Sequence, residues 1–211
     1  ELIQAGVRSE IEVAKLGVDI ETFLPPKDKR KAKKKLGINP DKLVVGYVGR
    51  VSLEKNVTTL LEAFRKLDSQ EHLVLLIVGD GKEEHVKQFH AVHNCHVTGF
   101  VKNANEYLQA MDVFVMPSLT ETTSLATLEA MASGLPVIAT KIGYIRKYLE
   151  RDKNGLFFPR ENPSLLGVQL RKLLSDENLR NRLGSAARRK VAYSFSWERS
   201  INRIKRLLLD T

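Results

Sequence analysis

The chain contains 211 residues, of which 43% are hydrophobic and 7% aromatic, a composition typical of globular proteins and unlike that of disordered or fibrous chains. The single cysteine, Cys95, leaves no partner for an intramolecular disulfide, and the longest apolar runs are far shorter than a membrane-spanning helix. We therefore expect a soluble globular protein in a reducing cytoplasm.

The formal net charge of +9 indicates either an anionic partner or helices with solvated basic faces. The basic residues gather in residues 27–35 and 171–206, and the lysine run has no aromatic side chain on which a base could stack. Solvated helix faces are the favoured interpretation. No nucleic-acid partner is expected, and peripheral contact with the inner face of a membrane is kept as an alternative.

The first 26 residues do not follow the pattern of the remaining chain. Residues 11–13 predict a short strand, whereas Gly17 and the pair Pro25 and Pro26 are typical of a connecting segment. We interpret residues 1–26 as an incoming connector.

From residue 43 onward, short apolar runs alternate with longer helical stretches, which predicts an α/β fold. The strongest predicted strands, rich in Val, Ile and Leu on both faces as buried parallel strands are, cover residues 43–48, 73–78, 112–116 and 136–139. Weaker candidates cover residues 95–98 and 155–158. Crossover helices are predicted at residues 57–67, 83–92, 105–110, 124–132 and 145–150. This pattern predicts a doubly wound, Rossmann-like parallel sheet of about six strands with helices on both faces.

After residue 163 the pattern is helical only. Helices are predicted at residues 165–174, 177–193 and 197–209. Because no further strand follows, we expect these helices to form a C-terminal cap.

The residues that follow each strand are the first candidates for a functional site, because ligands bind beyond the carboxyl ends of the strands in an open α/β sheet. Gly49 follows the first strand and allows close approach of a backbone, and Arg50 and Lys55 come shortly after it. A guanidinium fork and an ammonium group together suit a phosphate or a diphosphate. Two unrelated surface cations are the alternative interpretation.

Gly79, Asp80 and Gly81 follow the second strand. They match neither the GxxxxGK[ST] phosphate loop nor the GxGxxG dinucleotide motif. A plain tight turn is the simpler interpretation, and a backbone wall beside a bound sugar is the alternative.

Residues 116–134 form the most informative stretch. A buried strand ends at Pro117, and a helix begins near Ser124 after a polar loop. We expect Thr122, Thr123 or Ser124 to cap this helix, and the free backbone amides nearby suit an anion.

Two carboxylates flank that helix start. Glu121 lies in the loop, and Glu129 lies in the helix among apolar residues, where a carboxylate is rarely buried without a partner. A pair of vicinal hydroxyl groups would satisfy Glu129.

Together these motifs resemble the carboxy-terminal domain of family 4 glycosyltransferases, which belong to the group 1 glycosyl transferases and have the GT-B fold of two Rossmann-like domains. The resemblance covers nearly the whole chain. The matching segments are Gly49-Arg50 with Lys55-Asn56, Gly79-Asp80-Gly81, Gly99-Phe100-Val101, Pro117-Ser118, Glu121 with Glu129, the run AMASGLPV from Ala130, and Asn154-Gly155-Leu156.

The resemblance implies a role for each matching residue. Arg50 and Lys55 correspond to the pair that binds the donor diphosphate, and Glu121 to the carboxylate that contacts the donor sugar. Glu129 corresponds to the residue that binds the ribose. The other implied donor-binding residues, which line the base or offer backbone to the sugar and phosphate, are Gly49, Gly79, Phe100, Val101, Thr123, Ser124 and Leu125.

The resemblance also implies retaining transfer of a hexose from a UDP-sugar or GDP-sugar, with no cofactor and no divalent metal. The sequence contains no Asp-x-Asp pair that would bridge a metal to a diphosphate. Arg50, Lys55 and helix amides would instead stabilise the charge of the leaving nucleoside diphosphate. Many family members have a Gly-Phe-Gly type turn where this chain has Thr122, Thr123 and Ser124, so the donor sugar stays open.

A division into parts follows from the same resemblance. Residues 1–26 correspond to the interdomain connector, and residues 27–211 to a single nucleotide-sugar-binding domain whose N-terminal acceptor domain is absent. Without that domain we expect the isolated chain to bind donor but not to turn it over. The acceptor, a glycan, a lipid or a small molecule, stays open.

Two alternatives belong to other classes of function. One is a noncatalytic binding module for nucleotide-sugars or nucleic acid, and a steep salt dependence of binding would identify nucleic acid. The other is a metal site at a cluster whose spacing matches no zinc signature, formed by His85, His90, His93, Cys95 and His96.

Overall fold

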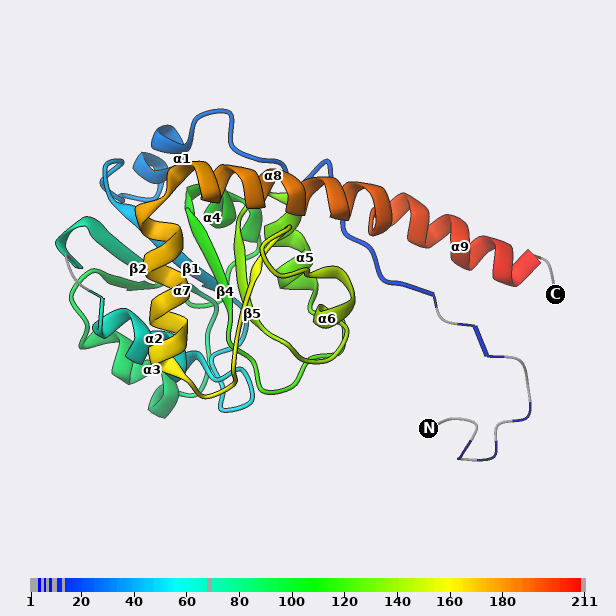
Figure 1. The fold of residues 1–211 in the computed structure, drawn as a ribbon, viewed down its shortest axis with the longest axis horizontal. Coiled ribbons are helices and arrows are strands. Elements are labelled where there is room, and N and C mark those ends of the chain that lie inside the picture. Colours follow the sequence, from blue (N-terminus) through cyan, green and yellow to red (C-terminus); the bar gives the residue numbers. More distant parts are fainter. Residues whose placement is uncertain are drawn as a thin grey trace.

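The computed structural model describes residues 14–67 and 70–209, together with residues 4, 6, 8, 11 and 12 (Figure 1). Its central element is a six-stranded parallel sheet with the strand order β3-β2-β1-β4-β5-β6. The strands are β1 Leu43–Val48, β2 Leu73–Val78, β3 Cys95–Val97, β4 Val113–Met116, β5 Val137–Thr140 and β6 Leu156–Phe158. The predicted fold class is confirmed, and each of the six strands predicted from residue 43 onward is present within one or two residues.

The strand order places a topological switch point between β1 and β4. On one side β1 pairs with β2 from Leu43↔Leu73 to Val48↔Val78, and on the other side it pairs with β4. All six residues of β2 are buried, as expected for a parallel strand that is covered on both faces. In such a sheet the crevice at the switch point, beyond the carboxyl ends of the strands, is where ligands bind.

Helices cover both faces of the sheet. The crossover helices are α2 Val57–Arg65, α3 Glu83–His90, α4 Ala104–Ala110, α5 Leu125–Ala132 and α6 Ile145–Tyr148. Two longer helices, α7 Pro163–Ser175 and α8 Glu177–Ser194, follow the last strand and form the predicted cap. Helix α7 packs against α2 and α8 packs against α5, so the two cap helices lie against crossover helices from opposite arms of the sheet.

The lysine run forms a further helix, α1 Lys29–Lys35, which begins at an Asp28 side chain that accepts a hydrogen bond from the amide of Lys31. Most of its lysines are solvent-exposed, as the interpretation of solvated helix faces requires. Lys33 is an exception, because it is buried and its Nζ lies 2.7 Å from Oδ2 of Asp112. Part of the basic charge in this run therefore holds α1 against the sheet. A short 3-10 helix, η1 Gln70–His72, precedes β2.

The connector is fixed to the C-terminal part of the chain. The amide of Val18 donates to the carbonyl of Phe195 at 2.8 Å, and the amide of Trp197 donates to the carbonyl of Val18 at 2.8 Å. Val13 of the predicted strand 11–13 lies outside the described residues, and Ile11 and Glu12 have no regular secondary structure.

The last helix, α9 Trp197–Leu209, extends away from the sheet as a continuation of α8, so it does not join α7 and α8 in the predicted cap (Figure 1). None of its residues is buried. Leu207 is half-buried, and the exposed large apolar side chains of this helix are Trp197, Ile201, Ile204, Leu208 and Leu209. No helix in the described part of the chain is long and apolar enough to cross a membrane.

Candidate functional site

Two of the loops singled out in the sequence lie side by side at the switch point. The loop after β1 contains Gly49 to Asn56, and the loop after β4 runs from Pro117 to Ser124. The amide of Leu119 donates to the carbonyl of Glu54 at 2.8 Å, and Nδ2 of Asn56 donates to the carbonyl of Pro117 at 3.3 Å. The structure therefore joins the predicted basic loop to the predicted acidic one.

An ion pair links these two loops. Nζ of Lys55 lies 2.8 Å from Oε1 of Glu121, and the Glu121 side chain is only 8% exposed. The hydroxyl of Ser118 donates to the same carboxylate oxygen at 2.9 Å. Because Glu121 is buried next to a cation and a hydroxyl, its charge is compensated without any ligand.

Arg50 lies in the same loop as Lys55 but has a different environment. Its side chain is exposed, and it forms no ion pair or side-chain hydrogen bond with the residues that the structure describes. The predicted clamp of Arg50 and Lys55 on one phosphate group remains a prediction, because Lys55 is paired with Glu121.

Tyr47 holds the start of the basic loop. Its buried hydroxyl donates to the carbonyl of Arg50 at 2.8 Å, and burial raises the pKa of this tyrosine, so the hydroxyl keeps its proton. A Cβ atom on Gly49, whose φ is +146°, would lie 2.7 Å from that hydroxyl oxygen. Tyr47 was missed in the sequence because an aromatic residue inside a buried strand gives no sign of a polar contact.

The turn of Gly79, Asp80 and Gly81 supports the basic loop from the other side. A Cβ on Gly79 would overlap the carbonyl of Gly49, and a Cβ on Gly81 would overlap the carbonyl of Val51. The amide of Val51 also donates to the carbonyl of Asp80 at 2.7 Å. Glycine is needed at both positions because the backbone of this turn approaches the backbone of the basic loop closely. The sequence analysis interpreted the turn as a plain tight turn or as a wall beside a bound sugar, and neither interpretation included this contact.

Helix α5 begins without the predicted side-chain cap. Ser124 occupies the N-cap position with a left-handed φ of 58°, and its side chain makes no capping hydrogen bond. Its hydroxyl instead lies 2.8 Å from that of Thr127. The capping prediction was wrong for Ser124, because the left-handed backbone allows its hydroxyl to pair with Thr127. The Ser124 hydroxyl therefore does not cap the first backbone amides of α5, around Ser124 and Leu125.

Neighbouring residues fix the loop before α5. The hydroxyl of Tyr148 donates to the carbonyl of Thr123 at 2.8 Å, and the amide of Tyr144 donates to the carbonyl of Thr122 at 2.8 Å. A Cβ on Gly143 would overlap the carbonyl of Glu121. Sequence reasoning missed Tyr148 and Gly143, since both lie well beyond the motif along the chain.

Glu129 lies one turn inside α5 and is half-buried. Within the part of the chain that the structure describes, its carboxylate has no ion pair or hydrogen bond, and burial raises its pKa. An unpaired carboxylate in this position is energetically unfavourable. The expectation that a pair of vicinal hydroxyl groups would satisfy this carboxylate remains a prediction.

A cavity of about 270 Å³ lies beside Glu121. Its lining residues are Ala14, Lys15, Leu16, Glu121, Thr122, Thr123, Gly143 and Tyr144. The connector therefore forms one wall of the candidate site. The sequence did not indicate this, because a connecting segment has no pattern that places it against a particular loop.

The loop after β3 contains the remaining predicted residues. Phe100 is 77% exposed, whereas Val101 is half-buried and packs against the core. Gly99 forms a bridge with Gly79, which places this loop next to the glycine turn. The structure thus brings Phe100 to the same edge of the sheet as Gly49, although it does not place it against Glu129.

The cluster of histidines around Cys95 does not converge. Among the described residues, no group of three or more His, Cys, Asp or Glu side chains could hold a metal ion. Burial also raises the pKa of Cys95 to about 12, which disfavours the thiolate that binds a metal.

The family model for glycosyl transferases group 1 matches residues 28–190. Because this range is most of the chain, and because the sheet and its strand-end loops have the expected order, the chain belongs to this family of glycosyltransferases.

Two curated relatives illustrate the extent of the similarity. The chain is 34% identical to the sulfoquinovosyl transferase SQD2 of Arabidopsis thaliana over an alignment of 217 residues, gaps included, that covers 97% of this chain and 41% of the plant protein. It is 30% identical to a D-inositol 3-phosphate glycosyltransferase of Xylanimonas cellulosilytica over an alignment of 202 residues that covers 89% of this chain and 48% of the relative. The chain spans about half the length of the curated relatives that it matches.

Solved structures show the same fold. The C-terminal domain of the group 1 glycosyl transferase LpcC from Francisella tularensis is 26% identical with a TM-score of 0.76, and the match covers 85% of this chain and 99% of that domain. Anabaena HepE in complex with UDP-glucose is 24% identical with a TM-score of 0.89, and the match covers 99% of this chain and 60% of HepE. The first of these matches identifies the present fold with that of a C-terminal domain.

Proposed function

We propose that the chain is the donor-binding half of a retaining, metal-independent glycosyltransferase that moves a hexose from a nucleoside-diphosphate sugar to an acceptor. The observation that carries this proposal is the Lys55–Glu121 ion pair at the switch point, where the two loops are joined by backbone hydrogen bonds. Beside it lie the exposed guanidinium of Arg50 and the start of α5, which has no side-chain cap. Cations and free amides at one place suit a diphosphate.

Each part of the donor has a candidate partner. Arg50, Lys55 and the amides of Ser124 and Leu125 hold the diphosphate, and Glu121 with Thr123 faces the sugar. Glu129 accepts from the ribose hydroxyls, which would relieve its unpaired, half-buried charge. Phe100 and Val101 line the base, and Gly49 and Gly79 allow the backbone to approach the donor.

The chemistry that these residues supply is stabilisation of a leaving group. As the bond from the sugar to the diphosphate breaks, negative charge grows on the diphosphate, and positioned cations lower the energy of that state. In the structure Lys55 is bound to Glu121, so donor binding would move its ammonium group toward the phosphate and leave Glu121 free to contact the sugar. Metal independence and retention are part of this proposal.

The acceptor-binding part lies outside this chain in the proposal. In support, the chain covers about half of each curated relative and matches a domain described as C-terminal. Residues 1–26 would connect the two halves, and residues 27–211 would form the donor domain. The exposed apolar side chains of α9 offer a surface for the other half. A reducing cytoplasm remains the proposed location, since the chain has one cysteine.

Calorimetric titration of the chain with uridine, guanosine and adenosine diphosphates, and with their sugar conjugates, tests the proposal. We expect saturable binding of one base, and UDP is the first to test because HepE was solved with UDP-glucose. Arg50→Ala and Glu129→Ala should each weaken binding about tenfold, the loss expected for one charged hydrogen bond. Lys66→Ala, at an exposed position at the C-terminal end of α2, is the control. If no nucleotide binds to the folded chain, the proposal fails.

Retention and metal independence need the complete enzyme with its acceptor. We expect turnover to persist in excess EDTA and the product to keep the anomeric configuration of the donor sugar, as read by proton NMR. An inverted product, or activity that returns only with added Mg²⁺ or Mn²⁺, would contradict these two parts while leaving donor binding intact.

A further inference from the structure

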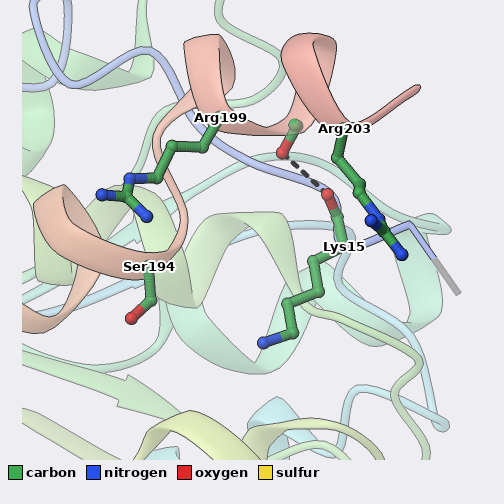
Figure 2. Close-up of a pocket in the computed structure, with 5 residues that line it drawn as sticks. Lys15, Ser194, Arg199 and Arg203 are labelled. Carbon is green, nitrogen blue, oxygen red and sulfur yellow. Dashed lines mark hydrogen bonds between the residues drawn. The ribbon is translucent and has the colours of Figure 1, made fainter. Parts of the chain in front are cut away.

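A second basic pocket lies between the connector and the C-terminal helices (Figure 2). It has a volume of about 340 Å³ and is lined by Lys15, Ser194, Arg199, Ser200 and Arg203. Figure 2 shows Arg199 and Arg203 on α9, Ser194 at the end of α8, and Lys15 on the connector. None of these residues belongs to the loops that follow the strands, so the pocket is separate from the proposed diphosphate site.

The two walls of the pocket are held together by hydrogen bonds. The hydroxyl of Ser200 donates to the carbonyl of Lys15 at 2.7 Å, which is the dashed line in Figure 2. The hydrogen bonds between Val18 and the residues on either side of Ser196 fix the next part of the connector. The cationic side chains on the opposing walls therefore start from a fixed backbone frame.

The pocket has more positive than negative charge. Nζ of Lys15 lies 5.7 Å from the ring centre of Phe195, and the guanidinium of Arg199 lies 4.9 Å from that of Tyr193. Such contacts orient a cation without neutralising it. Among the described residues, the carboxylate partner of the three cations is Glu12, which lies 2.6 Å from Arg203. Two of the three cations thus keep their full charge available.

We propose that this pocket binds the phosphomonoester group of a ligand other than the nucleotide donor. A phosphomonoester carries close to two negative charges at neutral pH, and it accepts hydrogen bonds from guanidinium, ammonium and hydroxyl groups, all of which line the pocket. The volume is within the range of small-molecule sites.

The position of the pocket indicates what kind of ligand this is. Lys15 lines both this pocket and the cavity beside Glu121. A molecule anchored here by its phosphate would lie next to the loop that faces the donor sugar. The ligand is then a phosphorylated acceptor, which this pocket would hold by its phosphate while the acceptor domain outside this chain would hold the rest of the molecule. This assignment rests on the proposed function, whereas phosphate binding itself does not.

Calorimetric titration of the chain with glycerol 3-phosphate and with inorganic phosphate, at constant low ionic strength, tests the site. We expect saturable binding that Lys15→Gln and Arg199→Gln each weaken about tenfold. Arg206→Gln is the matched control, because Arg206 is an exposed arginine of α9 that does not line the pocket. Glu12→Gln should tighten binding, since it frees Arg203 from its carboxylate partner.

Vesicles distinguish a free phosphate ester from a lipid headgroup. Phosphatidylcholine vesicles with and without phosphatidic acid are sedimented with the chain and with the same variants. Binding to phosphatidic acid vesicles alone, lost in Lys15→Gln and Arg199→Gln, assigns the site to a headgroup, and binding of the soluble ester assigns it to a free ligand. No binding in either form, or equal loss in Arg206→Gln, overturns the proposal.

The two proposals fail separately. Glycerol 3-phosphate binding should survive Arg50→Ala, and nucleoside diphosphate binding should survive Arg199→Gln. If Arg50→Ala abolishes both, a single diphosphate site explains all phosphate binding, and the second pocket is not a site.

Discussion

Lys55 is the residue on which the account of the site depends most, because its ammonium group has one partner in the structure and another in the proposed complex. It lies 2.8 Å from Glu121, which is buried and also accepts a hydrogen bond from Ser118. A diphosphate must therefore compete with a carboxylate for this cation. In the proposed function, this pair would hold Lys55 at the switch point until a more highly charged ligand binds.

Glu121→Gln tests this competition. The amide cannot hold Lys55 electrostatically, so the affinity for a nucleoside diphosphate without sugar should stay the same or rise. In the proposed function Glu121 contacts the sugar, so the variant should bind the sugar conjugate no more tightly than the nucleoside diphosphate alone. Calorimetry with matched pairs such as UDP and UDP-glucose measures both. A drop in diphosphate affinity as large as that of Lys55→Met would contradict the competition, because it would mean that Glu121 positions Lys55 for the diphosphate.

Glu129→Gln should separate stability from binding. Burial raises the pKa of Glu129 above its ordinary value of 4.5, so ionisation of the native carboxyl lowers the stability of the fold. That cost is absent below pH 4.5 and complete once the pH exceeds the raised pKa. At pH 7 we therefore expect Glu129→Gln to melt at a higher temperature than wild type.

Glu129→Gln should also bind nucleoside diphosphates more weakly than wild type.

The difference in melting temperature between Glu129→Gln and wild type should shrink toward zero as the pH falls below the ordinary carboxyl pKa, because both proteins are then neutral at this position. Thermal scans over that pH range measure it. A variant that is less stable at pH 7 would mean that Glu129 has a structural partner.

At the scale of elements, strands and helices were predictable because their apolar patterns are local. The six strands follow runs such as residues 73–78, whose side chains are all apolar. What could not be predicted is how loops meet. The packing of Gly81 under Val51 depends on the distance between two loops that follow neighbouring strands, and one sequence gives no such distance.

Gly81→Ala tests the packing of the glycine turn. The new Cβ would overlap the carbonyl of Val51, so either the turn or the basic loop must move. We expect a loss of about 1–3 kcal/mol in the free energy of unfolding, as for other overpacked sites. Urea denaturation measures it. Gly37→Ala is the control for a glycine with open space around it, although its positive φ of 70° adds some strain of its own.

Arg188 joins three elements and gives a second prediction at this scale. Its guanidinium donates to the carbonyls of Ile20 and Phe23 in the connector and of Ala132 at the end of α5. Arg188→Met would leave these carbonyls without a partner and should cost about 1–3 kcal/mol. Arg189→Met, at the exposed neighbouring position, should change the unfolding free energy by less than about 0.5 kcal/mol. Equal effects would contradict the role of Arg188.

At the scale of the whole molecule, the connector is the main feature that the sequence did not place. Its residues look like an ordinary linker, yet they pair with the junction of α8 and α9 through Val18 and line the cavity beside Glu121. The positions of the motif residues were predictable because they follow predicted strands, where ligands bind in an open α/β sheet. The residues that hold these strand-end loops, such as Tyr47 and Tyr148, could not be predicted. They belong to a strand and a helix whose apolar sequence patterns indicate only burial in the core.

The measurement that tests the central claim most directly is a map of backbone amide NMR shifts during titration of the chain with UDP and GDP. The account predicts that one nucleotide moves the amides of residues 49–55 and 123–126 together, at the switch point between β1 and β4. Shifts confined to Lys15 and the start of α9, or the absence of any saturable shift, would contradict it.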